Sequence, residues 1–224
     1  MGSVAATHRS SKGTFESERE NHFDHERPGR AIIMREVLML ASTSPQRRAI
    51  LEQLRIPFEV VVPTYVENDP PGLEPTELVR VHAEGKARSV HEAGQLTLGV
   101  DTAVVLDGRA YGKPADRADA VRMLDDLSGR THSVVSGVCL LGATEDVVAH
   151  EVTDVTMRPL SHAAVEGYLE SGEWEGRAGS YAIQGSGGRL VARIEGDYLN
   201  VVGLPGGLLV SLLERHAPNL LETA

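Results

Sequence analysis

Short apolar runs alternate with segments of helical spacing from Glu36 onward. The run 98–106 is long enough for a buried strand, and the Asp107-Gly108 pair that follows it is typical of a hairpin turn. The run 37–41 precedes a segment, 47–54, whose apolar residues are spaced as in a helix. This alternation predicts a mixed α/β fold with several antiparallel strand pairs.

The other elements are predicted from the same periodicities and from residues that begin or end helices. Thr76 and Ser161 are expected to cap helices, and Gly129 to lie just beyond the end of one. The predicted strands are 58–62, 133–141, 147–157 and 189–194, and the predicted helices are 76–91, 116–127, 161–169 and 208–215.

Residues 1–35 are polar and mixed in charge, so they contain little that could be buried. We therefore expect a disordered extension over 1–35, with Met34 as a candidate start, and one domain over 36–224. No stretch approaches the roughly 18 consecutive apolar residues of a membrane span, and the N-terminus lacks the apolar core of a secretory signal. A cytoplasmic protein without membrane contact is the expectation.

The formal net charge of -10 argues against stable binding to nucleic acid, which requires many phosphates to be neutralised. A small phosphate ligand would still fit a locally basic pocket. The single cysteine, Cys139, excludes an intramolecular disulfide and lies in an apolar run, which predicts a buried thiol.

The first candidate site motif is Ser42-Thr43-Ser44-Pro45-Gln46-Arg47-Arg48, at the change from a predicted strand to a predicted helix. The start of a helix offers free backbone N–H groups to an anion, and hydroxyl and guanidinium groups add phosphate contacts. A capped helix with solvated arginines explains the same residues. The motif alone therefore names no function.

Asp101-Thr102 is the second candidate, at or near the end of the apolar strand. A carboxylate there loses hydration, which is unfavourable unless a cation or hydrogen-bond donors replace the water. Metal binding or general-base catalysis would explain its presence. An aspartate that only caps a turn is the alternative. Glu67, in a proline-flanked loop, would supply a second oxygen ligand for Mg²⁺, or it is an ordinary solvated residue.

Lys86, Lys113 and Gln184 complete the candidates. Either lysine would neutralise a polyphosphate, although most lysines are simply exposed. Gln184, among glycines, has both a donor and an acceptor for a base edge. The sequence lacks a P-loop and a dinucleotide fingerprint, and one cysteine excludes the two-cysteine zinc site of nucleobase deaminases.

Taken in order, these motifs resemble the Maf family of nucleotide pyrophosphatases from about Leu38 to about Pro205. The resemblance rests on seven further blocks besides the opening Leu40 to Arg48: Glu67, Glu84-Gly85-Lys86-Ala87, Gly99-Val100-Asp101-Thr102, Gly112-Lys113-Pro114, Leu127 to His132, Ile183-Gln184-Gly185 and Val201 to Pro205.

The resemblance implies an elongated mixed β-sheet flanked by helices in two lobes with a central cleft, similar to inosine triphosphate pyrophosphatases. It implies Asp101 as the proton acceptor for a water that attacks the α-phosphorus of a nucleoside triphosphate. A divalent cation, Mg²⁺ or Mn²⁺, would be held by Asp101 and Glu67. Ser42, Arg47, Lys86 and Lys113 would bind phosphates.

Three positions bear on the base. Thr102 and Gln184 resemble the branch of the family that acts on dTTP and UTP, where a branch associated with 7-methyl-GTP has Gln and Glu. Gln46 departs from this pattern, since the dTTP/UTP branch usually has Arg there. An arginine replaced by glutamine loses a fixed charge and a planar set of donors.

The resemblance also implies a homodimer and leaves alternatives open. The same chemistry would serve 7-methyl-GTP, CTP or modified nucleotides, which makes a house-cleaning enzyme. A nucleotide-binding regulator of septum formation without turnover is a hypothesis of another class, and pyrophosphate release distinguishes it from an enzyme.

Overall fold

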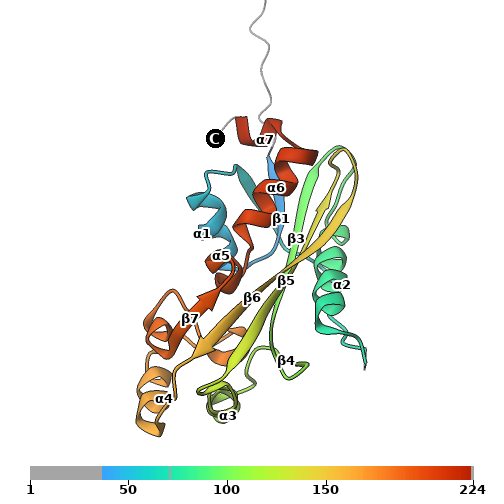
Figure 1. Ribbon diagram of the computed structural model, residues 1–224. Coiled ribbons are helices and arrows are strands. Elements are labelled where there is room, and N and C mark those ends of the chain that lie inside the picture. The colour runs from blue at the N-terminus through green and yellow to red at the C-terminus, as the bar shows by residue number, and fades with distance from the viewer. Residues whose placement is uncertain (1–36, 71, 223–224) are drawn as a thin grey trace, which may run out of the picture. The chain divides into compact units, whose positions relative to one another are not determined.

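The computed structural model describes residues 37–70 and 72–222, and the expected extension over 1–35 lies outside them. The described residues form one seven-stranded mixed sheet in the order β2-β1-β3-β5-β6-β7, with β4 paired to β3 (Figure 1). The strands are β1 Leu38–Ala41, β2 Phe58–Val61, β3 Leu96–Leu106, β4 Arg109–Tyr111, β5 Thr131–Leu141, β6 Val147–Met157 and β7 Val191–Glu195. The α-helices are α1 Pro45–Gln53, α2 Pro75–Arg88, α3 Arg117–Leu127, α4 His162–Leu169, α5 Tyr198–Val202, α6 Gly206–His216 and α7 Asn219–Glu222, and the 3₁₀ helices are η1 Ala178–Ser180 and η2 Ser186–Leu190.

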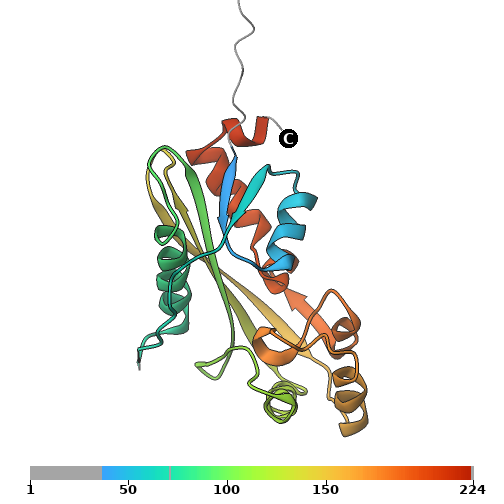
Figure 2. The same ribbon diagram turned by 180° about the vertical axis from the view of Figure 1, so that it is seen from behind.

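The sheet is parallel at one side and antiparallel elsewhere. Strand β1 pairs in parallel with β2 and β3, while β3, β5, β6 and β7 form an antiparallel series and β3 and β4 form a hairpin. Helix α2 covers one face of β3 and β5, and α1 and α6 lie on the other side of β1 (Figures 1 and 2). The predicted mixed α/β fold is confirmed.

Two glycines allow α2 to lie directly on the sheet. A Cβ atom at Gly99 of β3 would collide with the carbonyl oxygen of Ala83, and one at Gly137 of β5 with the carbonyl oxygen of Val79. Residues with side chains at these positions would push the helix away from the strands. The glycines therefore fix the distance between α2 and β3.

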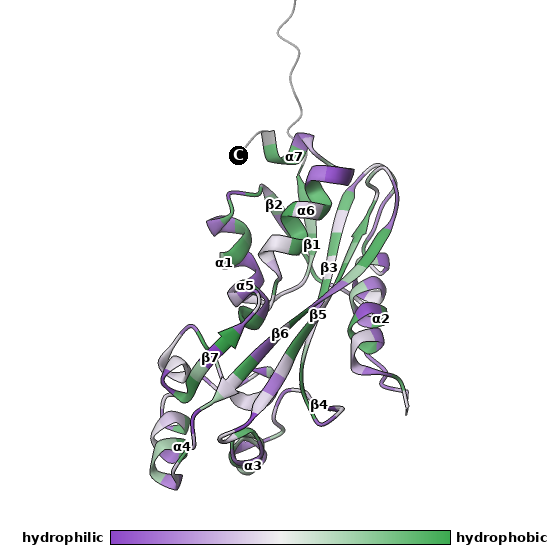
Figure 3. Ribbon diagram, in the orientation of Figure 1, coloured by the Kyte–Doolittle hydropathy of each residue, from purple (hydrophilic) through white to green (hydrophobic). Residues whose placement is uncertain are grey.

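Two hydrophobic clusters lie along the same long strands. One contains Leu98 and Val100 of β3 with α1 and α6, and the other contains Val104 and Leu106 of β3 with α3 and α4. Figure 3 shows hydrophobic colouring along β1 and α6 and hydrophilic colouring over much of α2. Between the clusters β3 is interrupted by polar side chains, so each cluster packs separately against its own helices.

Most predicted elements are confirmed within a few residues, including the hairpin, where Asp107 and Gly108 both have positive φ. The Thr76 cap is wrong, because α2 begins with Pro75 and has Glu74 at the N-cap position. Proline suits the first helical position, since its missing N–H would be unpaired there anyway. The short helices η1, η2, α5 and α7 have no counterpart among the predictions.

The position of Asp101 also needs correction, because this residue lies in the middle of β3 and not at its end. Strand β3 continues because it pairs with β5 from Thr97 to Val105. The parallel pairing with β1 does end nearby, at Ala41 and Gly99.

The buried state predicted for Cys139 is confirmed, and burial raises the pKa of its thiol to about 12. In the part of the chain that is described, no helix is long and apolar enough to cross a bilayer.

The buried side chain of His132 makes the stability of the folded chain depend on pH. Its Nε2 lies 2.8 Å from the Tyr181 hydroxyl, and its Nδ1 has no hydrogen-bond partner among the described residues. Burial lowers the pKa of His132 to about 4, and Asp154 acts weakly in the opposite direction.

We expect the free energy of unfolding to fall as the pH is lowered from about 6.5 to about 4, because in that window the unfolded chain binds a proton at residue 132 that the folded chain does not. The contribution of His132 to this loss is about 3 kcal/mol at most. Urea unfolding at pH 7 and pH 4.5 measures it in the wild type and in His132→Gln. Equal pH dependence in the two proteins would contradict the prediction.

Candidate active site

The candidate residues gather where the parallel part of the sheet ends. Ser42 directly follows the last paired residue of β1, and Asp101 lies two residues beyond Gly99, the last residue of β3 paired with β1. Ligands of open α/β sheets bind at the carboxyl ends of parallel strands, where the chain departs from the sheet. The two motifs singled out in the sequence therefore meet at such an edge.

Arg47 joins four segments at this edge. Its Nη1 donates to the Ser42 hydroxyl at 2.9 Å, its Nε to the Gly203 carbonyl at 3.0 Å, and its Nη2 to the Thr102 hydroxyl at 3.4 Å. Ser44 caps α1 by accepting from the Arg47 N–H. Because arginine has five N–H groups, these three bonds within the described residues leave two for an anion.

Thr102 is held by this network from several sides. Its hydroxyl lies 2.9 Å from the Ser136 hydroxyl on β5 and donates to the Gly203 carbonyl at 3.3 Å. A hydroxyl has one hydrogen to donate, and here that hydrogen and the oxygen both have protein partners. Thr102 therefore fixes Arg47 and the turn after α5.

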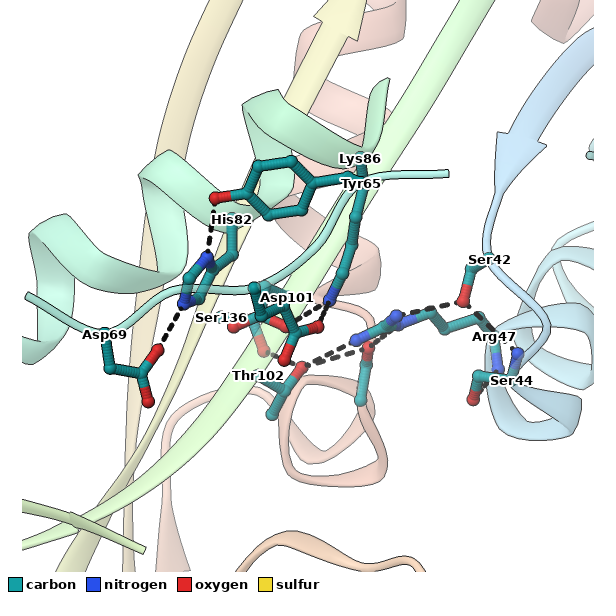
Figure 4. Close-up of polar contacts among 12 residues, drawn as sticks. Ser42, Ser44, Arg47, Tyr65, Asp69, His82, Lys86, Asp101, Thr102 and Ser136 are labelled. Atoms are coloured by element: carbon teal, nitrogen blue, oxygen red, sulfur yellow. Dashed lines mark hydrogen bonds and ion pairs between the residues drawn. The ribbon is translucent and has the colours of Figure 1, made fainter. Parts of the chain in front are cut away.

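Lys86 lies between two carboxylates, as Figure 4 shows for Asp101. Its Nζ is 2.6 Å from an oxygen of Asp101 and 2.6 Å from an oxygen of Glu67. The Lys86 side chain is only 12% exposed, so these ion pairs are less screened than surface pairs. The structure thus brings together three predicted site residues from α2, β3 and the loop before α2.

The charges of the site change the pKa values of two of its groups. Burial alone would raise the pKa of Glu67, but the hydrogen bond and charge of Lys86, with His82 and Lys113, lower it below its usual value. Burial lowers the pKa of Arg47, while Asp101 and Glu67 act against this effect. Glu67 is therefore kept ionised, and it faces the cations of the site.

These residues line one cleft of about 830 Å³, a size that suits a nucleotide. The remaining predicted residues, Gln46, Lys113 and Gln184, line the same cleft from α1, from the turn after β4 and from the segment before η2. The Gln46 side chain accepts from the Ser44 hydroxyl at 3.1 Å. The structure therefore places the cationic groups and the candidate base-reading residues around a common space.

Polar contacts hold the segment that carries Gln184 at positions before and after this residue. The Glu173 carboxylate accepts from the Ser186 N–H at 3.1 Å and from the Gly187 N–H at 3.3 Å, which lowers the pKa of Glu173. The Ala182 N–H donates to the Tyr168 hydroxyl at 2.9 Å. Gln184 thus lies between two anchored points of the chain.

Glu67 and Asp101 are the candidate ligands for a divalent cation. Within the described residues, no group of three or more His, Cys, Asp or Glu side chains could hold a metal ion by itself. Magnesium is commonly held by one or two carboxylates together with waters and substrate phosphates. Glu67 and Asp101, which share the Lys86 ammonium, could supply such carboxylates, with the nucleotide completing the site.

Near Glu67 lies a further group of polar residues that was not among the candidates predicted from the sequence. Tyr65 and Asp69 lie on either side of Glu67 and both contact His82 of α2. One signal was available, since His82 lies four residues before Lys86, on the same face of the helix, between the apolar Val79 and Ala83.

The chain is similar in sequence to a known protein family and to several known proteins. The Maf-like protein family matches residues 37–216. A dTTP/UTP pyrophosphatase from Symbiobacterium thermophilum is 49% identical, over 79% of this chain and 92% of that protein. A protein of the same description from Gloeobacter violaceus is 46% identical, over 79% of this chain and 94% of that protein.

Two solved structures are also similar to part of the chain. A HAM1 protein from Coxiella burnetii is 19% identical with a TM-score of 0.38, over 55% of this chain and 73% of that one. The Ham1 protein from Staphylococcus aureus is 15% identical with a TM-score of 0.40, over 55% of this chain and 72% of that one. The family match and the relatives, by contrast, each span about four fifths of the sequence, and the chain belongs to the Maf family.

Proposed function

We propose that this chain is a nucleoside triphosphate pyrophosphatase that hydrolyses dTTP and UTP to the monophosphate and pyrophosphate. The observation that carries the proposal is the Lys86 ammonium, 2.6 Å from both Asp101 and Glu67, in a cleft also lined by Arg47 and Lys113. Carboxylates beside several cations are the groups that phosphoryl transfer needs. The relatives named dTTP/UTP pyrophosphatase support the choice of substrate.

Asp101 accepts the proton of the attacking water in this proposal. The water oxygen forms a bond to the α-phosphorus, the bond from that phosphorus to the oxygen bridging to the β-phosphate breaks, and pyrophosphate leaves. Because Asp101 is on a strand paired with β5 and is held by Lys86, its carboxylate keeps a fixed position toward the water.

The cationic residues bind the phosphates. The two remaining N–H groups of Arg47 and the Ser42 hydroxyl, beside the start of α1, contact one part of the triphosphate, and Lys86 and Lys113 offset charge on another. Glu67 and Asp101 would hold Mg²⁺ or Mn²⁺, which supplies Lewis-acid stabilisation of the phosphate oxygens.

Base selection in this proposal depends on three positions. The amide of Gln184 presents a donor and an acceptor to a pyrimidine edge. Thr102 acts through Arg47, whose guanidinium it contacts. Gln46 of α1 lines the cleft. An arginine at this position, as in the dTTP/UTP branch, would extend a cationic group toward the substrate.

We further propose that residues 36–224 form the catalytic domain and that the enzyme acts in the cytoplasm as a homodimer.

Asp101→Asn is expected to lower kcat for dTTP by about 100-fold or more, because an amide cannot accept the proton although it has nearly the same shape. Pyrophosphate release at saturating Mg²⁺ measures the loss, and thermal unfolding checks the fold. Asp125→Asn on the exposed side of α3 is the matched control and should keep wild-type activity. Near-normal turnover by folded Asp101→Asn would remove the proposed role.

Gln46→Arg is expected to lower KM for dTTP and UTP by about three- to tenfold, because it adds a charged donor fork beside Arg47. Gln53→Arg adds the same charge at an exposed position at the end of α1 and controls for general electrostatic attraction. Steady-state kinetics of both variants give the comparison. Equal effects of the two substitutions would mean that residue 46 does not contact the substrate.

The substrate class itself is tested with a panel of dTTP, UTP, CTP, 7-methyl-GTP and modified pyrimidine triphosphates. We expect the largest kcat/KM for dTTP and UTP. Thermal stabilisation by a nucleotide without pyrophosphate release would instead indicate a regulator that binds but does not turn over.

A further inference from the structure

The segment between β2 and α2 carries Glu67 without regular secondary structure. Val66 beside it is 82% exposed, and the Glu67 side chain itself is 54% exposed. An irregular, exposed segment loses much conformational freedom when one of its side chains is kept at a fixed position. Other contacts must therefore hold Glu67 at 2.6 Å from Lys86.

Tyr65 and Asp69 supply those contacts through one imidazole. The Tyr65 hydroxyl lies 3.0 Å from Nδ1 of His82, and the Asp69 carboxylate lies 2.8 Å from Nε2 of the same ring. Figure 4 shows the two side chains approaching His82 from different sides. Residues 65, 67 and 69 all contact α2, as alternate residues of an extended segment can, while Val66 is turned to solvent.

The chemistry of the groups fixes the direction of one of the two bonds. A carboxylate only accepts hydrogen bonds, so Nε2 of His82 donates to Asp69, while either the Tyr65 hydroxyl or Nδ1 can be the donor in the other bond. His82 is 3% exposed, which protects both bonds from water.

Two features of helix α2 allow this segment to pack against it. A Cβ atom at Gly85 would collide with the Tyr65 ring, so the glycine allows the ring to lie against the helix. His82 and Lys86 are four residues apart on one face of α2, so the anchor of the segment and the partner of Glu67 are adjacent.

We propose that His82, bound to Tyr65 and Asp69, is a positioning residue that fixes Glu67 for binding the divalent cation with the nucleotide. We call these three residues the His82 clamp. The inference rests on the proposed function, because it assigns Glu67 to the metal. Groups that orient metal ligands from behind contribute substantially to metal affinity.

The test is the affinity for Mn²⁺ in the presence of an α,β-imido analogue of dTTP, measured by the electron paramagnetic resonance of free Mn²⁺. Tyr65→Phe keeps the ring on Gly85 and removes only the hydroxyl, and Asp69→Ala removes the other bond at an exposed residue. We expect each to weaken Mn²⁺ binding by about tenfold, with kcat at saturating Mn²⁺ within about twofold of the wild type. Asp69→Asn, which still accepts from Nε2, should restore most of the affinity.

A double-mutant comparison shows whether the clamp acts through Glu67. In a Glu67→Gln background, Tyr65→Phe should cause no further loss of Mn²⁺ affinity. His91→Leu is the control, because the His91 ring lies beyond the end of α2 and, among the described residues, bonds Thr97 and no residue of the clamp. Unchanged Mn²⁺ affinity in folded Tyr65→Phe and Asp69→Ala, or an equal loss in His91→Leu, would overturn the inference.

Mn²⁺ binding and pyrophosphate release by the wild-type protein distinguish a failure of the clamp from a failure of the proposed function. If wild-type protein binds Mn²⁺ with the analogue but releases no pyrophosphate from any triphosphate, the proposed function fails while the clamp is still measured. If the wild type turns over dTTP but the clamp variants bind Mn²⁺ normally, only the clamp fails.

Discussion

The ion pairs of Lys86 depend on how β3 passes between two hydrophobic clusters. Leu98 and Val104 belong to different clusters, so the polar residues between them are held by apolar packing on both sides. A carboxylate at such a place loses hydration and needs a cation. Helix α2 supplies Lys86, and it can do so because Gly99 lets the helix lie directly on β3. The packing of one helix on one strand therefore determines the position of Asp101 toward its partner.

The charge balance of the site is compatible with the proposed binding of a metal together with a polyanion. One ammonium and two carboxylates, at Lys86, Asp101 and Glu67, sum to a charge of -1. Arg47 and Lys113 line the same cleft and bring the sum to +1, so a triphosphate bound there would need a divalent cation to offset its remaining charge. The cation alone or the triphosphate alone would leave an excess of charge in a cleft where screening by water is reduced. The chain as a whole has a net charge of -10, so attraction of a polyanion must come from this local arrangement and from Arg47.

Local patterns predicted the strands, the hairpin and most helices, because periodicity and turn residues act over short distances in the sequence. They also singled out Asp101, whose carboxylate is unusual in an apolar strand, whereas the assignment of Lys86 to the site came from the family resemblance. The contact of Glu67 with Lys86 was beyond local patterns, since it depends on how an irregular segment crosses α2. The bond from Thr102 to Gly203 joins residues far apart in the sequence, and only the fold brings α5 to β3. For the same reason Asp101 was expected near a strand end, although pairing with β5 continues past it.

The two halves of the cleft are held by different kinds of interaction. Asp101 and Lys86 are on a paired strand and a packed helix, whereas Glu67 and Gln184 are on irregular segments fixed by polar contacts. His82 holds the segment of Glu67, and Glu173 holds the segment of Gln184 through two backbone N–H groups. Segments with few apolar contacts open at lower free energy than packed elements. Asp101, the proposed general base, therefore keeps one position, while Glu67 and Gln184 can move without disturbing the sheet.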